Sequence, residues 1–317
     1  CVQVEFEVTG GSYEGEVGAI GQQIDSGLSE GDEILLTAFE TETGRVVFAF
    51  FDHQRDSAMV WLVLLFAAAV IALGRWRGVG ALAGLTFSML VIVVFTLPAI
   101  LDGSDAFVVA LVTASLIAFA ALFLAHGFTM ATAVSLLSTL ASLIVTAALA
   151  SLFVGVTHLT GLSNESSLLL GGLTNGIDAR GILLAGIVIG SLGVLDDVTV
   201  TQVSAVWELK RLQPRLSTSE LVRPALRIGR DHISSTVNTL FLAYAGAALP
   251  LLLLFTSAGQ GVTDVITREL VATEIVRALV GSIGLVASVP ISTWLAAAVL
   301  APPDETATDT DPTDDRR

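Results

Sequence analysis

The sequence predicts an all-α polytopic membrane protein of about seven transmembrane helices, with a small extracytoplasmic β domain at the N-terminus. Three observations support this fold class. Of the 317 residues, 53% are hydrophobic and 14% are charged, and the mean hydropathy is +0.80. Long apolar runs fill residues 58–300, and residues 2–8 alternate apolar and polar side chains. An ordinary soluble enzyme is excluded, because apolar residues at this density need lipid as part of their solvent.

The net charge and the cysteine content exclude further classes of protein. The chain has 30 acidic and 15 basic residues, a formal net charge of −15, which argues against a nucleic-acid partner. Its single cysteine, Cys1, excludes a disulfide framework and a thiolate metal cluster. The lipid bilayer is therefore the first partner that the composition predicts.

The acidic residues divide the chain into three parts. Residues 1–57 contain 12 acidic but only two basic residues, and the alternation in Val2–Val8 predicts a half-buried strand. Two more strand-like runs follow, so this part is predicted to be an extracytoplasmic β domain that could bind a protein partner. Residues 58–300 form the predicted transmembrane helical domain. Residues 301–317 are acidic and rich in proline and threonine, which predicts a disordered cytoplasmic tail.

Seven apolar runs in the central part are each long enough to cross a hydrocarbon core of roughly 30 Å. They are Ala58–Gly74, Leu82–Leu101, Ala106–Ala125, Thr129–Val156, Gly181–Trp207, Ser235–Phe255 and Arg277–Leu300. Basic residues concentrate in the loop 210–230 and at Arg75 and Arg77, and counting the spans puts both clusters on one side. The positive-inside rule makes this side cytoplasmic, with the β domain outside and the tail inside.

Two adjacent carboxylates interrupt the fifth span. Asp196 and Asp197 follow the uncharged run Gly181–Leu195. Charges at membrane depth face a cavity or a partner, because lipid does not solvate them. In a helix, Asp197 and Thr201 share one face, which offers oxygen ligands to a cation or to a proton relay. The alternative is that the aspartate pair marks a hydrated helix end at the inner interface.

A second polar cluster begins the sixth span. Asp231, Ser235 and Asn238 share one helical face. Asp231 and His232 could exchange protons near neutral pH. Arg230 provides the alternative, because it could neutralise the aspartate pair as a structural ion pair between helices.

Together the two clusters predict a substrate- or ion-binding site between the fifth and sixth spans. The cofactor is unknown, but a bound cation would suit the acids, with Asp196, Asp197 and Asp231 as candidate metal ligands. A hydroxyl stripe in the fourth span fits either close helix packing or the lining of a pathway. Its members are Ser135, Ser138, Thr139, Ser142 and Thr146.

Several segments of the chain carry long, recognisable motifs. They are GRWRG (74–78), the turn His126-Gly127, LGVLDDVTVTQVSAVWEL (192–209), RIGRDHISSTVNTLFLAYAGAALPLLLLF (227–255) and EIVRALVGSIGLVASVP (274–290). In these segments the chain resembles the YibE/F family of bacterial membrane proteins. The resemblance covers most of residues 50–300. It implies a polytopic protein of the bacterial inner membrane with an extracytoplasmic N-terminal part. No catalytic residue follows from it, but the charged residues of both clusters lie inside the family's motifs.

Three classes of function are compatible with these features. The first is a secondary transporter or channel that moves a cation, a proton or a small solute; no GxxxxGK[ST] loop for ATP is present. The second is an intramembrane hydrolase that uses the same carboxylates, although HExxH, GxSxG and GxGD motifs are absent. The third is a membrane-anchored scaffold that binds a partner through the β domain. We favour transport over enzyme activity, and the sequence leaves the oligomeric state open.

Overall fold

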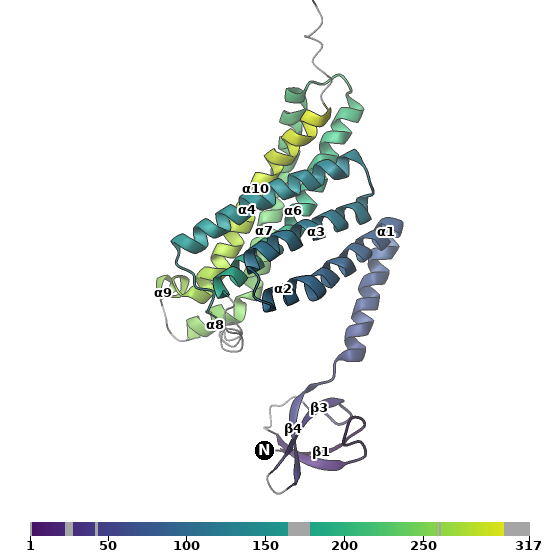
Figure 1. Cartoon of the computed structure of the whole chain (residues 1–317), viewed down its shortest axis with the longest axis vertical. Helices are drawn as coiled ribbons and strands as arrows, with labels where there is room; N and C mark the ends of the chain where they lie inside the picture. Colours follow the sequence, from purple (N-terminus) through teal and green to yellow (C-terminus); the bar gives the residue numbers. More distant parts are fainter. Residues whose placement is uncertain are drawn as a thin grey trace, which may run out of the picture. The chain divides into compact units, whose positions relative to one another are not determined.

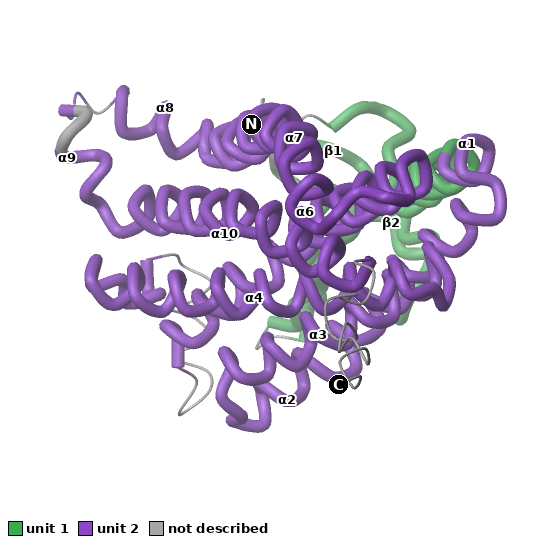
Figure 2. Tube along the Cα trace, turned by 90° about the horizontal axis from the view of Figure 1, so that it is seen from above, with its two compact units in different colours: residues 1–69 green, residues 70–317 purple. Residues whose placement is uncertain are grey.

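The computed structural model describes residues 2–22, 28–41, 44–163, 178–257, 259 and 261–300. The chain divides into two units, residues 1–69 and residues 70–317 (Figure 2). The division falls inside the first long helix. The predicted disordered tail, residues 301–317, lies outside the described residues.

Four strands form two antiparallel hairpins in the first unit. They are β1 (Val2–Glu7), β2 (Val17–Gln22), β3 (Ile34–Glu40) and β4 (Val46–His53). β1 pairs with β2, and β3 pairs with β4. Phe6 and Phe48 join the hairpins through an edge-to-face contact, with ring centroids 5.3 Å apart. These hairpins confirm a small N-terminal β region.

Helices form most of the rest of the described chain. They are α1 (Asp56–Val91), the π-helix η1 (Ile92–Thr96), α2 (Leu97–Leu101), α3 (Ala106–His126), α4 (Met130–Val156), α6 (Ala179–Leu212), α7 (Thr218–Ala247), α8 (Leu249–Ser257), α9 (Val262–Ile266) and α10 (Glu269–Leu300) (Figure 1). Local sequence explains several helix ends. The side chains of Asp105 and Thr129 accept backbone N–H groups at the starts of α3 and α4. The chain bends by 55° between α7 and α8, where Pro250 has no N–H to continue the helix.

The first apolar stretch reverses its direction at Arg75. Its backbone there is non-helical, with φ 52° and ψ −128°. A Cβ atom on Gly78 would lie 3.2 Å from the Cα atom of Ile71 and closer still to the Val70 carbonyl. In a straight helix, positions 71 and 78 are about 10 Å apart along the axis. The chain therefore turns back at Arg75, and only glycine fits at position 78.

The predicted number of spans is not confirmed. Among the described helices, five are long and apolar enough to cross a membrane, or six if the bent pair α7 and α8 counts as one span. Two of the expected spans, Ala58–Gly74 and Leu82–Leu101, fall within one stretch of 46 residues, Asp56–Leu101, on either side of Arg75. A mainly helical protein with several apolar spans is confirmed, whereas the number seven is not.

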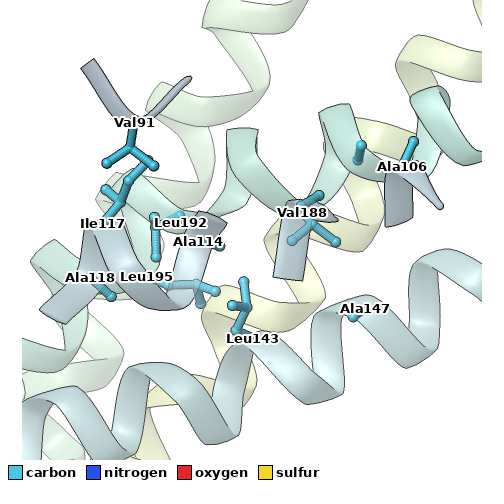
Figure 3. Close-up of a cluster of buried hydrophobic side chains, with 12 residues drawn as sticks. Val91, Ala106, Ala114, Ile117, Ala118, Leu143, Ala147, Val188, Leu192 and Leu195 are labelled. Atoms are coloured by element: carbon cyan, nitrogen blue, oxygen red, sulfur yellow. The ribbon is translucent and has the colours of Figure 1, made fainter. Parts of the chain in front are cut away.

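The core of the second unit is built on α3, α4, α6 and α10. α4, α6 and α10 each pack against the other two, and α3 packs against α6. Figure 3 shows one buried cluster of this core, in which Leu143 of α4 lies near Leu195 of α6 and Ala114 of α3. Gly284 of α10 packs directly on Thr146 of α4. Small residues at such positions let helices approach closely without a hydrophobic driving force between them.

Candidate functional site

Asp196 lies near the middle of α6, about 25 Å from either end at 1.5 Å per residue. Its side chain is half-buried, and its Oδ1 atom is buried with no hydrogen-bond partner in the described part of the chain. The side chain of Thr139, on α4, lies beside the same carboxyl group. A buried, ionised carboxylate without partners is energetically costly. A proton, a cation or a bound water molecule would satisfy this oxygen atom.

Two threonine hydroxyls, one on α4 and one on α6, lie next to Asp196. Thr199 donates its proton to the backbone carbonyl of Asp196, with an oxygen–oxygen distance of 3.1 Å. The hydroxyls of Thr139 and Thr199 are 2.7 Å apart and share a hydrogen bond. Either hydroxyl can be the donor in this bond, and the Thr139 hydroxyl is also placed to hydrogen-bond the Asp196 carboxyl group. The Oδ1 atom of Asp196 still has no partner among the described residues.

The remaining hydroxyls of the α4 stripe are paired within their own helix. Ser138 donates to the Val134 carbonyl at 2.7 Å, and Ser142 and Thr146 each donate to the carbonyl four residues earlier at 2.8 Å. Thr146 also packs against Gly284. These bonds support the packing interpretation of the stripe over a pathway lining.

Asp197 lies on a different face of α6 from Asp196. It is exposed, and so are Thr201 and the glycines one, two and three turns before it, Gly193, Gly190 and Gly186. Thr201 donates to the Asp197 carbonyl at 2.7 Å. The carboxylate itself has no ion pair or hydrogen bond to any described residue. We call these five positions the open face of α6.

The predicted cluster on α7 divides between two faces of the helix. Arg230, Asp231, Ser235 and Asn238 are exposed, whereas His232 is half-buried. The Nε2 atom of His232 is buried and finds no hydrogen-bond partner among the residues described. Within that same set, Arg230 forms no ion pair. The structure therefore does not support the alternative in which Arg230 forms a structural ion pair with Asp196 or Asp197.

The predicted residues lie on α6 and α7 and differ in their exposure. Asp196 lies beside α4, whereas Asp197 and Thr201 lie on the open face of α6. Where the chain is described, no group of three or more His, Cys, Asp and Glu side chains could hold a metal ion. Asp196, Asp197 and Asp231 therefore do not form a shared metal centre there. Asp196 is the strongest single candidate, because among the described acids it alone combines a position near the middle of a long helix with a buried, unpaired carboxyl oxygen.

Comparison with known families identifies the chain. The family described as YibE/F-like protein matches residues 62–302, which is more than half of the sequence. The chain belongs to the YibE/F family. Neither the search of curated proteins nor the search of solved structures found a match. Family membership and the apolar helices together indicate a membrane protein. All the candidate site residues of this YibE/F protein lie within the matched range.

Sequence reasoning did not identify Gln202, which connects three helices of the YibE/F protein through hydrogen bonds. Gln202 of α6 is 3% exposed, and its Nε2 donates to the Ala225 carbonyl of α7 at 2.8 Å and to the Thr293 hydroxyl of α10 at 2.7 Å. A Cβ atom on Gly229 of α7 would lie 2.8 Å from the Gln202 amide oxygen. The signal was a lone amide inside the apolar run of the fifth span, since an amide at membrane depth needs partners on other helices.

Proposed function

We propose that this YibE/F protein is a secondary transporter or channel that moves a cation or a proton across the bacterial cytoplasmic membrane. Asp196 is the residue that binds the moving species. The observation that carries the proposal is its buried Oδ1 atom, which has no partner in the described part of the chain. A proton or a cation that binds and leaves gives this costly group a use.

The open face of α6 supports a hydrated route along Asp197, the residue next to Asp196 in the chain. Three glycines, Asp197 and Thr201 follow one another at helical spacing along this face. Lipid solvates neither the carboxylate of Asp197 nor the backbone that the glycines expose, so water or a partner suits this face better. On α7, the exposed Asp231, Ser235 and Asn238 provide a second polar surface. The basic residues of segment 210–230, most of which belongs to α7, support a cytoplasmic position for this segment, with the β region outside.

Flux measurements on the purified full chain in liposomes test the proposal. With a pH- or ion-sensitive dye inside, we expect an imposed proton, Na⁺ or K⁺ gradient to collapse faster than in empty liposomes. Asp197→Asn and Asp231→Asn should each slow this flux by roughly tenfold or more. Each substitution removes one charged contact between the protein and the moving ion, and such a contact contributes about 1.5–3 kcal/mol. Gel filtration of each variant checks folding. Rates equal to those of empty liposomes for all three ions would contradict the proposal.

A further inference from the structure

A basic pocket lies between the first half of α7 and the last turns of α10. Its volume is about 500 Å³, and its wall includes Val222, Arg223, Leu226, Arg227, Arg230 and Trp294. The three arginines follow at steps of four and three residues, so they share one face of α7. All three arginines are exposed, whereas Val222, which also lines the pocket, is 6% exposed. We call these six residues the arginine pocket.

The arginines of this pocket lack counter-charges. None of them forms an ion pair with an acid in the part of the chain that the structure describes. Glu220, the acid at the start of the same helix, is engaged as a cap and accepts from the backbone N–H and the hydroxyl of Ser217 at 2.9 and 2.8 Å. Three unpaired positive charges within two helical turns attract an anion.

The rest of the pocket points to a lipid rather than to a free ion. Trp294 is 53% exposed and lies six residues before the end of α10, about 9 Å along the helix axis. Tryptophan and arginine at this level are typical of the membrane interface, where phospholipid headgroups lie. Val222 and Leu226 add an apolar wall. A ligand with a phosphate and an apolar body fits both parts of the pocket.

We propose that the arginine pocket binds the phosphate of an anionic phospholipid. Arg223 and Arg227 contact the phosphate oxygens, because a guanidinium donates two parallel N–H groups to such oxygens. Trp294 lies against the glycerol and the first carbons of the acyl chains. The acidic tail, residues 301–317, is the competing occupant. It carries six acidic residues but no leucine, isoleucine, valine or aromatic residue that would fill the apolar wall.

Native mass spectrometry of the full chain in detergent tests this assignment. Phosphatidylglycerol and phosphatidylcholine are supplied at equal concentrations, and the bound lipids are counted. We expect the wild-type chain to retain phosphatidylglycerol preferentially. The double variant Arg223→Gln/Arg227→Gln should lower this preference by about tenfold or more. The matched control, Arg211→Gln/Arg215→Gln, removes two charges outside the pocket and should leave the preference unchanged.

A third double variant keeps the test independent of folding. Arg223→Lys/Arg227→Lys preserves the charge but removes the forked geometry, so an intermediate preference is expected. Equal retention of both lipids by the wild-type chain, or an equal loss in the control, would overturn the proposal. Displacement of the lipid by an equal concentration of inorganic phosphate would assign the pocket to a free anion. Lipid binding that appears only after removal of residues 302–317 would assign it to the tail. Either result also overturns the proposal.

Discussion

Asp196→Asn is expected to reduce ion or proton flux in liposomes by about 100-fold or more, as for the loss of a group that transfers protons. Asparagine has nearly the shape of aspartate, so the packing of α6 against α4 should persist. Its amide, however, neither takes up a proton at neutral pH nor offers a charge to a cation. The flux is measured as for the wild-type chain, with the same gradients and equal amounts of reconstituted protein.

Glu208→Gln is the matched control for this variant. It makes the same chemical change on the same helix, but Glu208 is exposed and bound to Arg211 at 2.6 Å. A surface ion pair of this kind contributes little, so we expect wild-type flux and an unchanged melting temperature. Wild-type flux in Asp196→Asn would instead remove Asp196 from the transport mechanism and leave it as a residue of the helix interface.

Gly284→Ala is expected to destabilise the folded protein by roughly 1–3 kcal/mol, the usual cost of overpacking a tight interface. A Cβ atom at this position of α10 would overlap the Thr146 hydroxyl, and would lie 3.1 Å from its Cβ and 3.2 Å from its Cγ2. Because the Cβ atom of Thr146 is itself too close, no change of its side-chain rotamer relieves the overlap. The helices α4 and α10 must therefore move apart. The change is measured as the melting temperature in detergent.

The sequence provides a matched control for this second substitution. Gly190-Ser-Leu-Gly193 of α6 echoes Gly281-Ser-Ile-Gly284 of α10, but nothing lies within 4 Å of a Cβ atom at Gly193. Gly193→Ala should therefore stabilise the helix by about 0.5–1 kcal/mol, because alanine loses less backbone entropy than glycine. Opposite shifts of the two melting temperatures are expected. A destabilisation of equal size in both variants would contradict the close packing of α4 on α10.

Hydropathy predicted most of the helices, because an apolar run of sufficient length is a property of the local sequence. The caps at Asp105 and Thr129 follow the same local rules. The break between the first two spans was predicted at residues 75–81, but the positive φ of Arg75 was not, since such a backbone angle at a residue other than glycine is imposed by the contacts around it.

The sequence located the aspartate pair on the fifth long apolar segment but could not show that the two residues have different surroundings. Adjacent residues of a helix point about 100° apart, so Asp196 and Asp197 face different surroundings. Which of them is buried depends on where α4 packs, and this contact joins residues that lie far apart in the chain. For the same reason, hydroxyl periodicity alone could not show that Ser138 and Ser142 are paired within α4. Gln202 was overlooked because a single amide has no spacing pattern.

Infrared difference spectroscopy of the reconstituted wild-type chain and Asp196→Asn tests directly whether the buried carboxyl group of Asp196 binds a proton or a cation. We expect the difference spectrum to contain the carbonyl band of a protonated acid, or a carboxylate band that shifts when the transported cation is added. A free, ionised carboxylate whose band does not respond to any tested cation would contradict a binding role for Asp196.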